Sequence, residues 1–151
     1  MQADRDQQCQ PVVPGIFRAS SGGQGLELVG GHCPACHRYY FPRPPRCPYC
    51  LGQVEEQGLG ATGTLYTYTV VRVRPPYGLP SPYALGYVDL DGNGLRVLGL
   101  LAPESLDKLE IGMRLRLAVG QLGCDVGGAP CLRPYFEPAP PHPSQGMQPD
   151  V

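Results

Sequence analysis

Four cysteines in the first third of the chain have the spacing of a metal site. Cys33 and Cys36 form one Cys-x2-Cys pair, and Cys47 and Cys50 form a second pair after ten intervening residues. Two such pairs can place four thiolates tetrahedrally around one ion, and thiolates favour zinc, with tetrahedral iron as the chemical alternative. Free thiols or a redox-active Cys-x-x-Cys pair are the competing interpretation, which the duplicated pair disfavours.

A site with four cysteine ligands leaves no coordination position for water or substrate. We therefore expect the metal to fold a small ribbon and not to activate a nucleophile. His32 and His37 flank the ligands and could replace one of them. A role beside the metal or in contact with solvent is favoured for both, because four cysteines already complete the coordination shell.

Three further cysteines, Cys9, Cys124 and Cys131, lie outside this motif. A nucleophilic cysteine needs a base, and the one histidine outside the ribbon segment is His142, in a proline-rich tail. We therefore predict no catalytic residue in this chain and interpret the three thiols as structural or incidental.

Arginines gather in the ribbon and in the segment that follows it. Between residues 28 and 87 there are five arginines and only two acids. Guanidinium groups suit forked contacts to phosphate or carboxylate, although a solvated surface is the alternative. Arg72 and Arg74 are predicted to share one face of a strand that runs into a loop with four prolines and Tyr77. Such a loop could hold its shape before binding, or could simply connect two strands.

Length and composition exclude several classes of protein. With 151 residues, the chain is too short for the core of a thiolase, dehydrogenase or kinase. Its 21 glycines and 19 prolines predict many loops, whereas 42% apolar residues predict a globular fold. The net charge of −1 argues against a general polyanion binder. No run of about 20 apolar residues and no leader sequence is present, so we expect a cytoplasmic protein without membrane contact.

The pattern of apolar residues predicts a mostly β protein in four parts. These are an N-terminal arm (1–25), a zinc ribbon (26–60), a five-stranded OB-type barrel (61–137) and a proline-rich tail (138–151). The barrel strands are expected at 62–73, 84–90, 95–101, 113–119 and 131–137, with a turn at 91–94 and a short helix at 105–110. The apolar piece of the arm, residues 12–17, is expected to dock on its own domain, with another chain as the alternative.

Six segments, in this order, resemble the family known as domain of unknown function thirty-five: Leu28-Val-Gly-Gly-His-Cys-Pro-Ala-Cys36, Tyr40-Phe-Pro-Arg43, Cys47-Pro-Tyr-Cys50, Gly63-Thr-Leu-Tyr-Thr-Tyr-Thr-Val-Val71, Tyr83-Ala-Leu-Gly-Tyr-Val-Asp-Leu90 and Ile111-Gly-Met-Arg-Leu-Arg116. Members of that family join a rubredoxin-like zinc ribbon to an OB-fold. The resemblance covers about residues 26–137 and maps the zinc ligands onto the two cysteine pairs. His37 stands where many ribbons have glycine.

The resemblance implies a helper subunit, because family members typically bind a thiolase-like enzyme or an acyl-CoA hydratase. The partner would supply the catalytic cysteine and histidine, and the pair would form a hetero-oligomer that presents or channels a CoA thioester. In that setting we expect Arg43, Arg72, Arg74 and Tyr77 near CoA, since guanidinium groups pair with phosphate oxygens. The proline-rich loop could cover the acyl-pantetheine channel and exclude water.

Two other functions remain as alternatives. An OB-type barrel with a zinc ribbon could bind single-stranded nucleic acid, with Tyr66 and Tyr68 stacking on bases. The net charge counts against that function. Alternatively, the chain could be a pure scaffold that stabilises a larger assembly without touching substrate.

Overall fold

The computed structural model describes residues 9–22 and 25–140 of the chain. The expectations for the first residues of the arm, for His142 and for most of the tail lie outside the described residues. The strands are β1 (Gln10–Pro11), β2 (Phe17–Ala19), β3 (Leu26–Cys33), β4 (Arg38–Tyr40), β5 (Glu55–Gly58), β6 (Thr62–Val71), β7 (Tyr83–Leu90), β8 (Arg96–Leu101), β9 (Arg114–Cys124) and β10 (Pro130–Pro138). Two 3-10 turns, η1 (Pro76–Gly78) and η2 (Pro103–Ser105), complete the set.

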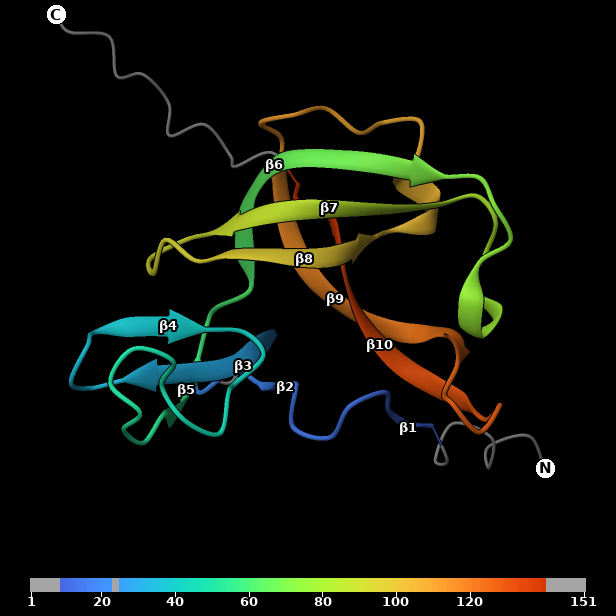
Figure 1. Ribbon diagram of the computed structural model, residues 1–151. Coiled ribbons are helices and arrows are strands. Elements are labelled where there is room, and N and C mark those ends of the chain that lie inside the picture. The colour runs from blue at the N-terminus through green and yellow to red at the C-terminus, as the bar shows by residue number, and fades with distance from the viewer. Residues whose placement is uncertain (1–8, 23–24, 141–151) are drawn as a thin grey trace, which may run out of the picture.

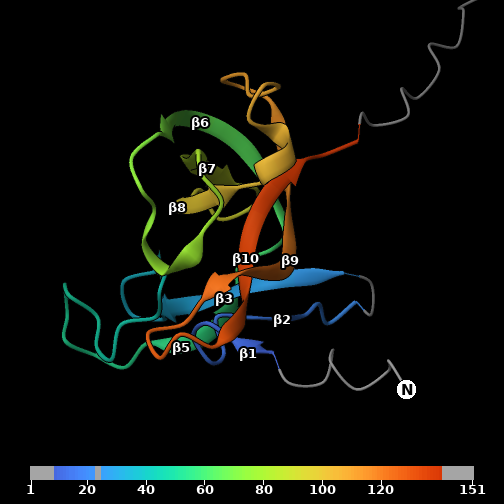
Figure 2. The same cartoon turned by 90° about the vertical axis from the view of Figure 1, so that its right-hand side faces the viewer.

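Strands β6 to β10 close into a five-stranded barrel, as the sequence predicts (Figure 1). β6 pairs antiparallel with β7 and β9, β7 pairs with β8, and β9 pairs with β10. The barrel closes through a parallel contact between β8 and β10, where Leu101 pairs with Phe136. Seen from the side, β9 and β10 run next to each other down one wall (Figure 2). This strand order is that of an OB-fold.

The barrel strands form where buried and exposed residues alternate. β7 buries every second residue from Ala84 to Leu90, and in β6 Leu65 is fully buried next to an exposed Tyr66. The expected turn at 91–94 connects β7 to β8, with Gly92 and Gly94 at positive φ. β9 extends beyond the expected residue 119 to Cys124, because β10 supplies hydrogen-bond partners along that whole length.

Two local predictions were wrong. Strand β6 ends at Val71, which is paired with Tyr83, the first residue of β7. Arg72 and Arg74 therefore lie beyond the strand, where no partner backbone is left, and they do not share a strand face. The expected helix at 105–110 is replaced by the shorter η2, which ends at Ser105 and is followed by turns because Lys108 bonds back only three residues.

The ribbon is built around β3, and the arm lies against both the ribbon and the barrel. β3 pairs antiparallel with β2, β4 and β5. In the arm, β1 pairs in parallel with β10, and the Val29 amide donates to the Ile16 carbonyl. The described part of the arm thus docks on its own chain. No helix among the described residues is both long and apolar enough to cross a membrane.

One core joins the ribbon to the barrel. Leu28 of β3 and Leu59, just after β5, are almost completely buried in the same cluster as Leu65 and Leu115 of the barrel. A second small cluster around Cys33, Cys47 and Val54 lies within the ribbon, too far out to belong to the barrel core. The ribbon is therefore fixed to the barrel at the inner end of β3, and its cysteines lie at the outer end.

Asp91 ties the β7–β8 turn to two other strands. Its carboxylate accepts hydrogen bonds from Thr62 in β6 and from the Arg114 guanidinium in β9. These contacts, chiefly the one from Arg114, lower the pKa of Asp91 to about 2. A lowered pKa in the folded state gives stability that is present above the ordinary aspartate pKa of about 4 and is lost as the pH falls toward 2.

We expect Asp91→Asn to lower the free energy of unfolding at pH 7 by about 0.5–1 kcal/mol, a small value because the ion pair is half exposed. The difference from the unchanged chain should shrink between pH 4 and pH 2 in urea denaturation curves. Asp107→Asn, on an exposed turn, is the matched control and should have no such effect. Equal stability of the Asp91 variant and the control at pH 7 would contradict this role.

Candidate functional site

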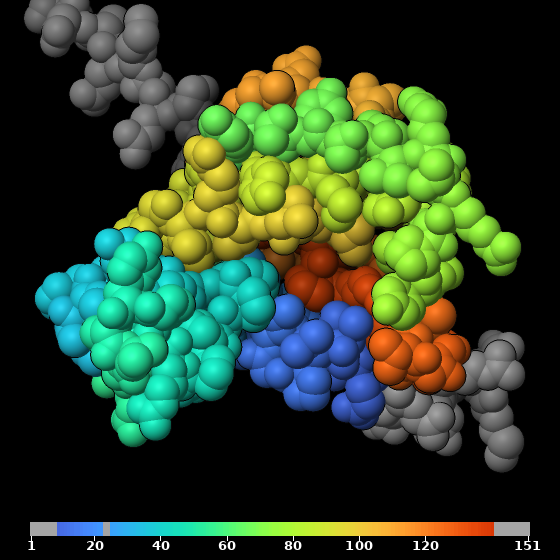
Figure 3. Space-filling view, in the orientation of Figure 1, coloured from blue at the N-terminus to red at the C-terminus, as the bar shows by residue number. Residues whose placement is uncertain are grey.

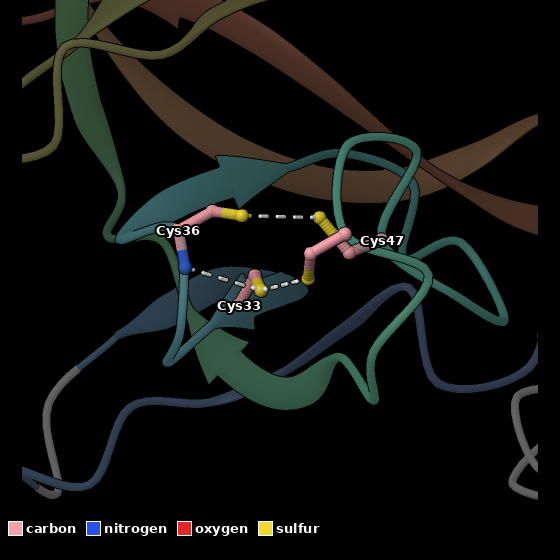
Figure 4. A group of neighbouring side chains, drawn as sticks. Cys33, Cys36 and Cys47 are labelled. Atoms are coloured by element: carbon pink, nitrogen blue, oxygen red, sulfur yellow. Dashed lines mark hydrogen bonds between the residues drawn. The ribbon is translucent and has the colours of Figure 1, made fainter.

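The four predicted ligands lie together at the outer end of the ribbon. Their sulfur atoms are all within 4.8 Å of one another. The Sγ atoms of Cys33 and Cys50 are 3.6 Å apart, and those of Cys36 and Cys47 are 3.9 Å apart. Figure 4 shows the side chains of Cys33, Cys36 and Cys47 pointing toward one another from the end of β3 and from two loops.

Both cysteine pairs sit in the same kind of turn. The amide of His37 donates to the Cys33 carbonyl, and the amide of Leu51 donates to the Cys47 carbonyl, each at 2.8 Å. His37 and Leu51, the residues that follow the second cysteine of each pair, have φ values of 56° and 60°. Glycine would adopt this conformation more easily, yet His37 forms the same turn after the first cysteine pair as Leu51 forms after the second.

The donor geometry fits a tetrahedral metal ion. Zinc–sulfur bonds of about 2.3 Å place tetrahedral sulfurs about 3.8 Å apart, close to the two sulfur–sulfur distances here. Cys33 and Cys47 are completely buried, whereas Cys50 is exposed. His32 instead packs its ring against Tyr39, with centroids 4.7 Å apart. The four cysteines would hold the ion, and its chemistry there is structural because no ligand position is left for substrate.

Tyr40 tunes the metal-binding group. Its hydroxyl lies 3.3 Å from the Cys47 sulfur. Donation of this hydrogen bond is the main reason why the pKa of Cys47 is lowered to about 6, and the same contact raises the pKa of Tyr40 to about 12. The pKa of Cys36 rises to about 12, first through its hydrogen bond with Cys50 and then through burial. Cys47 is thus prepared as a thiolate near neutral pH.

An apolar groove lies beside the ribbon, where the arm, the ribbon and the barrel meet. It encloses about 260 Å³. Figure 3 shows the molecule hollowed there, with the barrel above, the ribbon at the left, the arm below and β10 at the floor. Its walls include Val12 and Ile16 of the arm, Leu28 and Phe41 of the ribbon, and Leu98 and Phe136 of the barrel.

The floor of the groove depends on a missing side chain. Gly99 in β8 faces the ring of Phe136, and a Cβ atom at position 99 would lie 2.9 Å from two ring carbons. Phe136 is almost fully buried and also belongs to the barrel core. The ring therefore occupies the space that a side chain at position 99 would need.

A second cavity of about 260 Å³ adjoins the first and is more polar. It lies between the arm and the ribbon, shares Ile16 with the groove, and is lined by Arg43 and Glu56. The Nε and Nη2 atoms of Arg43 both donate to the Val54 carbonyl, at 3.0 and 2.7 Å. Arg43 therefore has a structural role in the ribbon and keeps Nη1 free of hydrogen bonds within the described residues.

The other predicted ligand-binding residues lie in the loop that follows β6. Arg72 and Arg74 are exposed in the segment after β6, and Tyr77 is exposed in η1. The structure therefore does not bring Arg43 together with this loop, which lies on the far side of the hollow from the ribbon (Figure 3). The sequence analysis missed Arg133, which lines the groove and is only 9% exposed. Its position two residues after the buried Cys131 in an alternating strand was the available signal.

We expect Tyr40→Phe to weaken zinc binding roughly tenfold at pH 7, because the Cys47 thiol then titrates closer to its ordinary pKa and protons compete with the metal. The loss should shrink toward pH 9, where the thiol ionises without help. Competition with a colorimetric zinc chelator measures the affinity. Tyr39→Phe, whose ring packs on His32, is the control. Equal affinity of both variants at pH 7 would show that Tyr40 does not assist the site.

Comparison with known proteins places these features in a family. Residues 21–55 match the family model described as "ChsH2, rubredoxin-like zinc ribbon domain", and residues 56–120 match "ChsH2, C-terminal OB-fold domain". The chain is similar to a solved structure titled "Ltp2-ChsH2(DUF35) aldolase", at 31% identity with a TM-score of 0.59. That match covers 76% of this chain and 86% of the other.

Curated relatives agree with this assignment. A DUF35 domain-containing scaffold protein of Methanocaldococcus jannaschii is 33% identical over 58% of this chain, which spans just under two thirds (64%) of that relative. A Pyrococcus furiosus protein of the same description is 33% identical over 63% of this chain and 70% of its own length. The benzoylsuccinyl-CoA thiolase subunit BbsA of Thauera aromatica is 31% identical over 82% of this chain and 84% of that subunit. The chain therefore belongs to the DUF35 family, in which a ChsH2-type rubredoxin-like zinc ribbon is joined to an OB-fold domain.

Proposed function

We propose that this chain is the non-catalytic, zinc-binding accessory subunit of a thiolase-type acyl-CoA acyltransferase complex, in which it helps to bind or channel the CoA thioester. Benzoylsuccinyl-CoA thiolase, named for one relative, is an example of such a complex. The observation that carries the proposal is the apolar groove at the junction of arm, ribbon and barrel, with an arginine-lined cavity next to it.

The placement of the histidines in the described part of the chain supports an accessory role. The four ribbon cysteines form a closed metal-binding group. Among the described residues the only histidines are His32 and His37, and both lie next to that group and away from the three other cysteines. A thiol nucleophile in the described part of the chain therefore has no imidazole base. In this proposal the reacting groups come from a partner; one relative is a thiolase subunit, and a similar solved structure is an Ltp2-ChsH2(DUF35) aldolase.

The groove and its neighbouring cavity suit different parts of a CoA thioester. An apolar groove of about 260 Å³ can hold an acyl or pantetheine segment and keep water from it. The adjoining cavity offers the free Nη1 of Arg43, which could pair with a phosphate oxygen. Because the two cavities meet at Ile16, an extended ligand could reach from one to the other.

An exposed apolar surface supports association with a large partner. On the outer face of β6 to β8, Tyr66, Tyr87 and Leu98 are about half exposed. Val73, in the segment after β6, is 72% exposed. Apolar side chains gathered on one face are typical of protein interfaces. In this proposal Arg72 and Arg74, which are exposed on either side of Val73, lie near the partner and its CoA.

The nucleic-acid alternative loses one of its two stacking residues. Tyr68 is partly buried against the barrel core and donates a hydrogen bond to the Leu109 carbonyl. The Tyr66 ring is covered by the Arg96 guanidinium, whose central carbon lies 3.3 Å from the ring centroid. Base stacking would have to displace that cation. The accessory-subunit function is therefore better supported.

We expect the chain, coexpressed with a thiolase-type catalytic protein encoded next to it, to elute with that protein as one hetero-oligomer in size-exclusion chromatography. The apolar face of β6 to β8 provides the physical reason. A charge placed on this face by Tyr87→Asp should dissociate the complex, whereas Val126→Asp, at a 91% exposed hairpin tip, should not. Separate elution of the two unmodified proteins would refute the proposal.

Within the complex, we expect Arg43→Gln to raise KM for the CoA thioester about tenfold with little change in kcat, the effect of losing one charge-assisted hydrogen bond. Arg116→Gln, which removes an exposed ion pair with Glu137, is the matched control and should leave KM unchanged. The double variant Arg72→Gln, Arg74→Gln tests the loop in the same assay. Unchanged kinetics in an intact complex for both the Arg43 variant and the Arg72/Arg74 double variant would favour a pure scaffold.

A further inference from the structure

Arg133 carries a buried positive charge that no acid neutralises within the described residues. The side chain lines the apolar groove and is 9% exposed. None of the ion pairs in the described part of the chain includes it. Asp125, the acid in the adjacent β9–β10 hairpin, uses its Oδ1 to accept the amides of Gly127 and Ala129. Buried charges are normally paired, so this arrangement is incomplete.

The contacts of Arg133 leave two donors free. Nη1 donates to the Leu122 carbonyl at 2.5 Å and to the Cys131 sulfur at 3.2 Å, and Nη2 donates to the Cys124 carbonyl at 2.9 Å. A guanidinium has five N–H donors. Three are used, so Nε–H and one hydrogen of Nη2 make no hydrogen bond within the described residues. Two neighbouring donors match the two oxygens of a carboxylate.

One of the free donors, Nε, is not fully buried. No fully buried side-chain nitrogen among the described residues lacks a hydrogen-bond partner, so the unused Nε is accessible and not sealed inside the protein. The cavity that Arg133 lines is the groove. The Tyr77 ring of η1 lies on another side of the guanidinium, with its centroid 5.8 Å from the central carbon. The Leu122 and Cys124 carbonyls carry no charge, so they do not neutralise the guanidinium.

We propose that the groove accepts an acyl group that carries a free carboxylate, and that Arg133 recognises this carboxylate. The inference rests on the proposed function in taking the ligand to be an acyl compound. The apolar walls contact the carbon chain, and a single negative charge balances the single guanidinium. The ligand class is then the monothioester of a dicarboxylic acid, or an acyl group of equivalent charge. A neutral acyl group would leave the buried cation unpaired and would bind more weakly.

Two small probes of similar shape separate charge recognition from simple apolar filling. The full zinc-loaded chain is titrated with 4-phenylbutyrate and with 4-phenylbutan-1-ol, followed by NMR of groove methyl groups. We expect the acid to bind at least tenfold more tightly than the alcohol. Arg133→Gln should reduce this ratio to about one by weakening the acid only, whereas the control Arg116→Gln should keep it. Equal binding of both probes to the unchanged chain, or binding of neither, would overturn the inference.

Because Arg133 also bonds the β9–β10 hairpin, its glutamine variant could unfold. Two measurements keep the test decisive. The Nε–Hε resonance of Arg133 in the unchanged chain should shift with the acid and not with the alcohol, and an absent shift overturns the inference. Arg133→Lys should retain a preference for the acid, weaker than that of arginine. These titrations need neither CoA nor a catalytic partner, so their outcome is independent of the copurification test. A chain that does not copurify with a thiolase-type protein can still prefer the acid, and a chain that copurifies can still show no preference.

Discussion

The burial of Leu28 and Leu59 in the barrel core is the interaction on which the rest of the structure depends. Leu28 lies near the inner end of β3, and Cys33, a metal ligand, is the last residue of the same strand. One strand thus connects the metal-binding group to the barrel. Phe41, which follows β4, packs against the same core and forms part of the groove wall. A ribbon folded by its metal therefore holds one side of the groove in place.

This arrangement separates the stability of the protein from its binding surface. The closed shell of four cysteines contributes folding energy, because a ribbon of this size buries too little apolar surface to be stable alone. The groove, in contrast, lies between parts of the chain that are far apart in sequence, with the arm on one side and β8 and β10 on the other. Neither the ribbon nor the barrel alone would form it. A small protein gains a ligand-sized site by joining units that separately have no room for one.

Local sequence patterns predicted the features that depend on local interactions. The spacing of the cysteines predicted the metal-binding group, and the alternation of apolar residues predicted five barrel strands and the turn at 91–94. The end of β6 could not be predicted from its own residues, because it depends on where β7 begins. The apparent continuation of the alternating pattern through Val73 therefore placed Arg72 and Arg74 in a strand that stops at Val71.

The groove itself could not be predicted, because its walls meet only in three dimensions. The apolar arm residues Val12 and Ile16 indicated a docking segment, but not that they would face Phe136 across a cavity. Arg43 was selected for its charge, and the structure shows that two of its five donors bind the ribbon backbone. Arg133 was overlooked because a strand arginine is ordinarily exposed, although Arg133 shares a strand face with Cys131, which the structure buries.

The close approach of Gly99 to the Phe136 ring has a consequence for how this protein can diverge over time. A methyl group at position 99 would collide with the Phe136 ring. A substitution at position 99 alone would therefore be removed by selection or would change the shape of the groove. A smaller aliphatic residue would first have to replace Phe136 and so leave space for a side chain at position 99. Positions 99 and 136 are therefore expected to change together during evolution. Homologues that differ at both positions should bind ligands of different width.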